Sequence, residues 1–391
     1  MRVFSLIAGL ACLVEVLLDA FQTIILPRRA TGRLRVSRLF LTATWLPWRA
    51  IARRMHKNRR RESFLSYFGP LSLLLLVAVW AAGLVLGFAL LYRGIGSPFT
   101  DTKTFGPLET DLYVSGTTLF TLGLGDVVPQ SAIARMLVML EAGTGLGFVA
   151  GVIGYLPVLY GAFASREVSI ILLDARAGSP PSAVELLRRH AGPAGALALQ
   201  TLLVEWERWS AQLLESHISY PQLCFFRSQH DNQSWLSALV AILDACALLI
   251  ATMEGESVRQ AQLTFAMARH AVLDLAHSFP DSGRNAAENR LTPSSVDDVC
   301  RQLADSGFTL CAGAASVDRL QELLRMYEPQ AQKLSRVLMQ PLPRFSPEPG
   351  QRTSWTTVAL LRSQTEASLP SAASMRNVSV TPAVTEDEHF F

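Results

Sequence analysis

An uncharged stretch from Tyr67 to Tyr92 limits the folds open to this 391-residue chain more than any other feature. As an α-helix it reaches ~39 Å, whereas the hydrocarbon core of a bilayer is about 30 Å thick. Half of the residues are hydrophobic and 17% are charged, against about 25% charged in ordinary soluble domains. The sequence therefore predicts an all-α membrane protein and argues against a wholly soluble enzyme.

Two further apolar stretches favour membrane helices. Ala132 to Phe163 is long and rich in glycine, and it is interrupted by Arg135 and Glu141. Near the start of the chain, Val3 to Leu26 carries Glu15 and Asp19 four residues apart. An acid costs roughly 3 kcal/mol at the bilayer centre, so we expect both to face protein or water. A full span, a half-inserted helix and a cleaved signal peptide remain open for this segment.

The charge of the chain is concentrated in one loop. Twelve Lys and Arg residues lie between Arg28 and Arg61, and short basic loops resist translocation. We therefore expect a multi-pass protein of the cell membrane with this loop and its C-terminal part in the cytoplasm. Within the loop, Leu39 to Trp48 is a short apolar segment with Trp45 and flanking arginines. It predicts an interfacial helix on anionic membrane lipid, and we expect no nucleic-acid partner.

Between the two strongest spans lies a segment, Asp111 to Asp126, that is too short to cross the membrane. Its first part suits a short re-entrant helix over Asp111 to Phe120, with Thr110 or Asp111 as the N-cap. Glycines then alternate after a threonine. A row of backbone carbonyls can replace the hydration shell of an ion only in unusual dihedrals that glycine tolerates. The pattern indicates a pore loop with carbonyls that face an ion.

This segment resembles the pore loop and filter of the potassium channel family, usually written T-V-G-Y-G-D. The matching positions are Tyr113, Ser115, Thr118, Leu119, Thr121, Leu122, Gly123, Leu124, Gly125, Asp126 and Pro129. The resemblance implies that Thr121 to Gly125 line the ion path and that Asp126 closes its outer mouth. Two residues depart from the family: Leu124 replaces the usual Tyr or Phe, and Phe120 stands where a small hydroxyl residue is common. Loss of the tyrosine hydroxyl predicts a softer filter with less strict selectivity.

Three residues of the following helix are candidates for gating or ion attraction. Gly145 lies where the family carries its hinge glycine, although close helix packing explains a membrane glycine equally well. Pro157 removes a helix hydrogen bond near the cytosolic end, which predicts a kink. Glu141 is an acid within the membrane, and it either faces a water-filled cavity or bonds to a neighbouring helix.

After Gly178 the chain shows repeated helical periodicity. We expect an all-helical cytosolic domain with helices at about 182–190, 194–216, 232–253, 257–279, 295–305 and 316–339. Asp244 lies in the middle of a very apolar helix, and it favours a buried bundle helix over another span. His270, Asp274 and His277 share one helix face, but three ligands without a fourth are weak grounds for a metal site.

The predicted organisation has six parts. They are an N-terminal membrane helix (1–27), a basic cytosolic loop with the interfacial helix (28–64), a pore module (65–164), a linker (165–181), a helical domain (182–345) and a disordered tail (346–391). Within the pore module we expect an outer helix at 66–93, the pore helix and filter at 110–130 and an inner helix at 131–164.

The leading functional hypothesis is a homotetrameric, potassium-preferring channel, because one chain supplies one pore loop and a carbonyl cage of this type needs four. The helical domain then regulates opening or serves as a passive assembly module, and its regulatory ligand is not predicted. The alternative is a membrane-anchored signalling or binding protein with a degenerate or weakly selective cation pore. No set of acid, base and nucleophile indicates an enzyme. We expect no cofactor, and no metal besides permeating K+.

Overall fold

The structure is a computed structural model that describes residues 1–26, 36–56, 59–100, 106–230, 232–253, 256–279, 290–291, 293–308 and 313–347. In these residues it contains helices and no strand, apart from one isolated bridge between Phe99 and Pro129. The predicted all-α class is therefore confirmed. Residues Met1–Pro349 form one compact unit. The predicted tail at 346–391 lies, from residue 348 onward, outside the described residues, as do parts of the basic loop.

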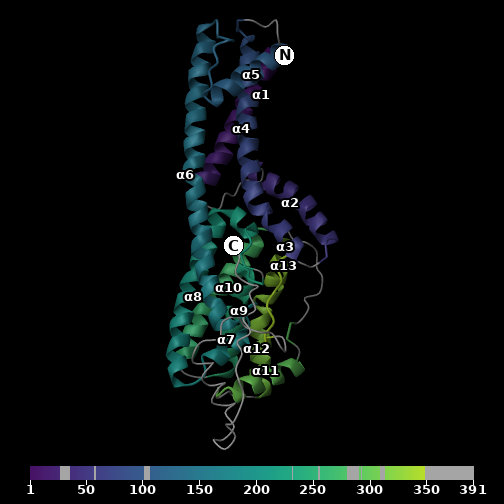
Figure 1. The fold of residues 1–391 in the computed structure, drawn as a ribbon, viewed down its shortest axis with the longest axis vertical. Helices are drawn as coiled ribbons and strands as arrows, with labels where there is room; N and C mark the ends of the chain where they lie inside the picture. Colours follow the sequence, from purple (N-terminus) through teal and green to yellow (C-terminus); the bar gives the residue numbers. More distant parts are fainter. Residues whose placement is uncertain are drawn as a thin grey trace, which may run out of the picture. The chain divides into compact units, whose positions relative to one another are not determined.

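Four helices build the apolar part of the chain: α1 (Arg2–Ile24), α4 (Phe68–Ile95), α5 (Pro107–Leu119) and α6 (Ala132–Ala177). α1 lies along α4, and the short α5 contacts both α4 and α6 (Figure 1). Glycine permits the close approach of α1 to α4, because a Cβ on Gly9 would lie 2.7 Å from the Gly87 carbonyl oxygen. α1, α4 and α6 are long and apolar enough to cross a membrane. The chain is a membrane protein.

The two acids of α1 have different surroundings. Asp19 is buried and accepts hydrogen bonds from the Ser37 backbone (3.0 Å) and hydroxyl (2.9 Å) and from the Trp80 indole (2.8 Å). Glu15 is exposed on the surface of the single chain. Asp19 therefore faces protein as expected, and it ties α1 to the start of α2 (Val36–Arg54) and to α4.

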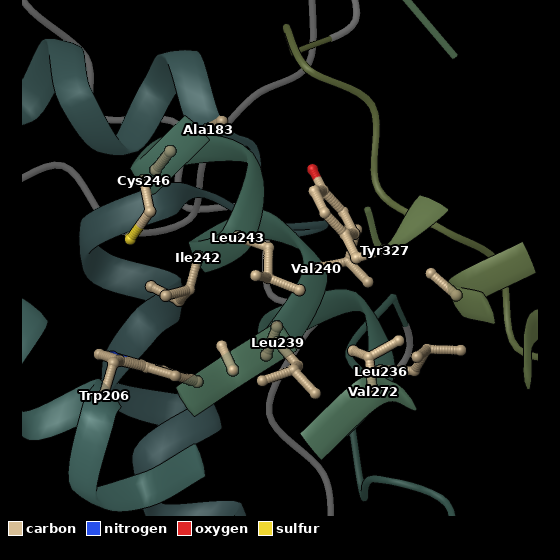
Figure 2. Packing of buried hydrophobic residues seen from close by; sticks show 14 of the residues in the cluster. Ala183, Trp206, Leu236, Leu239, Val240, Ile242, Leu243, Cys246, Val272 and Tyr327 are labelled. Atoms are coloured by element: carbon tan, nitrogen blue, oxygen red, sulfur yellow. The ribbon is translucent and has the colours of Figure 1, made fainter. Parts of the chain in front are cut away.

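The second half of the chain forms a helical bundle. Its members are α7 (Ala183–Arg189), α8 (Pro193–Ser219), the 3-10 helix η1 (Pro221–Phe225), α9 (Trp235–Thr252), α10 (Glu256–His277), α11 (Pro293–Asp305), α12 (Ala314–Arg325) and α13 (Glu328–Leu338). α9 is apolar enough to cross a membrane by composition, but it is buried along its whole length by its neighbours. Figure 2 shows side chains such as Trp206, Val272 and Tyr327 around it. α9 is thus a bundle helix, as Asp244 predicted.

The segment expected to lie on lipid packs one of its faces against this bundle. α2 is longer than predicted, and Trp45 is buried, with its indole donating to the Val337 carbonyl at 3.0 Å. Its ring lies 4.7 Å from Phe68 and 5.0 Å from Phe225. One continuous core therefore joins α2, the first turn of α4 and the bundle. The basic loop and the helical domain were predicted to be separate. This prediction is wrong, because buried apolar side chains of α2, α3 (Arg59–Ser66), α4 and the bundle belong to one core.

The predicted linker at 165–181 is also wrong for most of its length. α6 continues without interruption to Ala177, well past the expected end at residue 164. Within the predicted linker, the side chains of Arg166 and Glu167 are buried and paired at 2.8 Å. Ile170 and Leu173 then bury their side chains in the bundle core. The inner helix of the pore module therefore continues into the bundle as one helix.

Candidate functional site: a pore loop

The loop that follows α4 leads directly into α5. Gly106 is the N-cap and Pro107 begins the helix, with the Glu109 side chain accepting from the Gly106 N–H at 3.1 Å. The N-cap predicted at Thr110 or Asp111 is therefore wrong, because proline and the Glu109 cap start the helix earlier. Asp111 is instead buried and accepts from the Ser97 hydroxyl at 2.8 Å. The helix is thereby fixed to the end of α4.

The residues after α5 have an alternating backbone. Thr121, Gly123 and Gly125 have φ values of +57°, +52° and +79°, whereas Leu122 and Leu124 between them do not have positive φ. Left-handed backbone is uncommon outside glycine, so Thr121 adopts a conformation that the fold must enforce. Such alternation can turn successive carbonyls to one side of the chain.

Hydrogen bonds show which side that is. The N–H groups of Leu122 and Gly123 both donate to the carbonyl of Thr117 on α5, at 2.8 and 3.3 Å. In a trans peptide the C=O points opposite to the N–H of the next residue. The carbonyls of Thr121 and Leu122 therefore both point away from α5. A row of oxygens on one face is the arrangement that can replace the hydration shell of a cation.

The outer end of the loop is held at several points. The Tyr113 hydroxyl on α5 donates to Asp126 Oδ2 at 2.7 Å. The Thr100 N–H donates to the Val128 carbonyl at 3.0 Å, and the Gln130 N–H donates to Pro98 at 2.8 Å. Asp126 thus follows Gly125, and its orientation is set by Tyr113, while its role at the outer mouth stays a prediction.

Glu141 is not exposed to a cavity within the chain. Its carboxylate is fully buried and accepts from the Tyr92 hydroxyl at 2.5 Å and from the Ser115 hydroxyl. Tyr92 belongs to α4 and Ser115 to α5, so this acid on α6 joins all three pore helices behind the loop. The interpretation as a cavity acid is wrong, and the alternative of a bond to a neighbouring helix is correct.

The two hinge candidates have different environments. A Cβ on Gly145 would lie 2.0 Å from the Leu119 carbonyl oxygen at the end of α5, so the missing side chain allows α6 to touch the pore helix. Pro157 is exposed in the interior of α6, where it lacks the N–H that would bond to Ile153. Gly145 therefore has a packing role, while hinge motion at either residue stays a prediction.

One side of the pore loop is open in a single chain. The side chains of Leu122 and Leu124 are 64% and 65% exposed, and Phe120 is also exposed. On α6, the glycines at 143, 147, 151, 154 and 161 have nothing in the described structure within 4 Å of an added Cβ. Both the candidate filter and the inner helix thus present a bare surface beside the residues that would face an ion.

Arg166 connects the inner helix to the bundle. Its guanidinium is buried and donates to the carbonyls of Leu223 (3.0 Å) and Phe226 (2.9 Å), at either end of a turn of η1. It also lies 3.2 Å from Nε2 of His217. Burial, and then the positive charge of Arg166, lower the pKa of His217 well below its ordinary value. His217 is therefore held neutral at the junction.

The same short helix also contacts the outer helix. A Cβ on Gly69, in the first turn of α4, would lie 2.7 Å from the Phe226 ring. The segment Pro221–Phe226 is thus wedged between the start of α4 and the inner helix α6. No periodic pattern in the sequence indicates this wedge, because a five-residue 3-10 helix is too short to show one.

No metal centre is formed by the predicted histidine face. His270 Nε2 lies 3.4 Å from Asp274 Oδ2, and both belong to α10. Among the residues that the structure describes, no group of three or more His, Cys, Asp or Glu side chains could hold a metal ion.

Comparisons with known proteins agree with this geometry. Residues 74–159 match the family described as ion channel. The chain is also 25% identical over 279 residues to the uncharacterized membrane protein YdjJ of Bacillus subtilis (strain 168), across 70% of this chain and 78% of that protein. No solved structure matches the chain. The resemblance to a channel pore is therefore confirmed for the segment that contains α5, the loop and most of α6.

Proposed function

We propose that this chain, whose residues 74–159 match the ion channel family, forms a potassium-preferring channel as a homotetramer. The observation that carries the proposal is the alternation of positive φ at Thr121, Gly123 and Gly125, together with the hydrogen bonds from the Leu122 and Gly123 N–H groups to α5. This backbone turns carbonyls to one open side. The ligand chemistry of a bare carbonyl row suits a dehydrated monovalent cation.

The homotetramer follows from what one chain lacks. A single loop surrounds an ion on one side only, and its apolar neighbours Leu122 and Leu124 are exposed. Four copies around an axis would close the carbonyl cage and cover these side chains. Non-helical backbone at membrane depth is tolerated only when it is enclosed by protein or lines a water-filled path.

Flux measurements test the channel itself. Purified protein in liposomes should pass K+ down a gradient, and reversal potentials in mixed K+ and Na+ should favour K+. Equal permeability would contradict the selectivity, and absence of flux under all conditions would favour the alternative of a binding or signalling protein with a degenerate pore. Leu124→Tyr should raise the K+/Na+ permeability ratio if the missing hydroxyl softens the filter.

We also propose a cell-membrane location with the helical bundle in the cytoplasm. The basic residues between Arg28 and Arg61 support this orientation, since short basic loops stay on the cytoplasmic side. Labelling of a cysteine placed at residue 60 by an impermeant reagent added from outside the cell would show the reverse orientation.

Anionic lipid remains a proposed partner of α2, through the face that does not touch the bundle. Leu39, Leu46 and Ile51 are exposed there, and Arg53 and Arg54 are exposed at its end. Such a mixed apolar and basic face suits the membrane interface. Arg53→Glu should lower the amount of phosphatidylserine that stays bound to the detergent-solubilised protein, and Arg301→Glu on α11 serves as the control.

The bundle is positioned to regulate the pore. α6 is one helix from the pore loop to the bundle core, and Arg166 fixes it to η1. A ligand bound in the bundle would shift opening only by its differential affinity for closed and open states. Truncation after Ala177 tests this role: tetramers with unchanged open probability would favour a passive module.

A further inference from the structure

The end of α6 that follows the pore module carries exposed apolar side chains. Val168 is 58% exposed and Leu172 is 56% exposed, and Ile171 between them is also exposed. The opposite face of the same two turns is buried, because Ile170 and Leu173 lie in the bundle core. The helix is therefore apolar on both faces here, and the described part of the chain covers one of them.

A second exposed apolar strip lies on α8. Leu197 is 71% exposed, and Thr201 and Val204 follow it at helical spacing on the same face. Arg176 on α6 and Glu205 on α8 form an ion pair at 3.4 Å. Leu172 lies one turn before Arg176, and Val204 directly precedes Glu205. The pair thus brings the two strips to the same side of the molecule.

Lipid is a poor occupant for this surface. Phe68, the first residue of α4, already lies in the core of the bundle beside Phe225, with ring centroids 5.3 Å apart. Ile170 and Leu173 belong to that same core. This part of α6 therefore lies at the level of the bundle, beyond the start of the outer membrane helix. Exposed apolar groups here face water unless protein covers them.

The surface continues the bare face of the inner helix. At about 100° per residue, Leu146, Ile153 and Ile171 fall within about 20° of one another around the axis of α6. Leu146 and Ile153 are both 65% exposed in the pore part. In a tetrameric pore this face turns toward the neighbouring copies, and an uninterrupted helix of 46 residues carries it onward into the bundle.

We propose that the surface formed by Val168, Ile171 and Leu172 of α6 and by Leu197 and Val204 of α8 contacts a second copy of this chain. The proposal rests on the tetrameric pore proposed above. Its bundles then meet around the same axis as the filter and extend the assembly below the membrane. The Arg176–Glu205 pair is neutral overall, so it adds no net like-charge repulsion where identical surfaces meet.

Cross-linking in membranes of the producing cells tests this interface. Three single-cysteine substitutions are compared with the unsubstituted chain: Val168→Cys at the interface, Ile153→Cys in the pore part and Leu263→Cys on α10. Leu263 is a matched control because it is 49% exposed and apolar but lies on a different helix of the bundle. A short membrane-permeant bismaleimide should give covalent dimers with Val168→Cys and Ile153→Cys at several times the yield of Leu263→Cys.

The outcomes separate this proposal from the pore itself. Dimers from Ile153→Cys without dimers from Val168→Cys would overturn the bundle interface and leave the tetrameric pore standing. Dimers from neither would contradict the tetramer. In a second measurement, Val168→Asp should lower the tetrameric fraction of the full chain in detergent several-fold by native mass measurement, with Leu263→Asp unchanged. An equal tetrameric fraction in both variants would contradict the interface.

Discussion

α9 and the pore loop differ in how much of their structure one chain can complete. α9 is the apolar centre of the bundle and is buried along its whole length by helices of the same chain. In the pore loop, α5 accepts hydrogen bonds from the N–H groups of Leu122 and Gly123, but the side chains of Leu122 and Leu124 are exposed and the carbonyl row is open. The difference indicates that one chain completes the core of the bundle by itself, whereas it leaves the pore loop open on one side, as the proposed tetramer requires.

The largest expected effect is on the scaffold behind the loop. Gly145→Ala would place a Cβ 2.0 Å from the Leu119 carbonyl oxygen, a backbone atom that cannot move without displacing α5. We expect K+ flux in liposomes to fall at least a hundredfold. Gly143→Ala is the control, because an added Cβ there meets nothing in the described structure within 4 Å.

Two outcomes would change this interpretation. Flux equal to that of the unsubstituted protein would contradict the packing role of Gly145. Normal assembly with an altered open probability would instead support the hinge predicted from its position in the helix.

The second effect concerns the stability of the helical bundle. Asp244 on α9 is fully buried and pairs with Arg290 at 2.7 Å, and Tyr327 also donates to it. Asp244→Ala removes one of the two carboxylates that pair with Arg290, and Glu328 at 2.8 Å remains. Because Glu328 compensates part of the charge, we expect a loss of stability below the about 3–5 kcal/mol of a buried charge that has no partner. Thermal unfolding of the bundle should move to lower temperature.

An exposed ion pair provides the matched control for Asp244. Asp298 and Arg301 lie 3.3 Å apart on the surface of α11. Asp298→Ala should change the free energy of unfolding by less than about 1 kcal/mol. If the two substitutions lowered the free energy of unfolding equally, the ion pair on α9 would contribute no more than an exposed pair, against the central place of α9 in the bundle.

A third effect depends on pH at the junction of the two regions. The pKa of His217 is lowered in the folded protein, so between that value and about 6.5 the unfolded chain binds more protons. Stability of the bundle should therefore fall as pH drops below about 6.5. His217→Gln should make the stability less dependent on pH over this range.

His190 must be controlled in the same experiment. Burial also lowers the pKa of this side chain, which belongs to the turn after α7. Urea unfolding at pH 5 and pH 7.5 with His190→Gln should retain part of the slope. If the free energy of unfolding of His217→Gln changed with pH as much as that of the unsubstituted protein, the buried neutral imidazole of His217 would not cause the pH dependence.

The sequence predicted the helices and the loop but not the connections between them. Hydrophobic periodicity and Asp244 were sufficient to place α9 in a bundle, and the alternating glycines located the loop. The partners of Glu141, the burial of Trp45 and the continuation of α6 past Arg166 depend on residues distant in the chain. The sequence alone does not distinguish a charged or amphipathic side chain that is solvated by water from one that contacts lipid or a distant backbone carbonyl.

The smallest expected effect is at the mouth of the loop. Tyr113→Phe removes the hydroxyl that donates to Asp126 Oδ2 at 2.7 Å, while the ring still fills its place on α5. This hydrogen bond lies at an exposed site, where water competes for both partners, so its contribution is small. We therefore expect K+ flux to persist with a permeability ratio of K+ to Na+ that is a few-fold lower in reversal-potential measurements.

Thr117→Val is the contrasting variant, because the Thr117 hydroxyl bonds only within α5 in the described structure. An unchanged ratio in Tyr113→Phe would show that the carbonyl row is held by its backbone bonds to α5 alone, so that the open side of the loop needs only neighbouring copies to complete it.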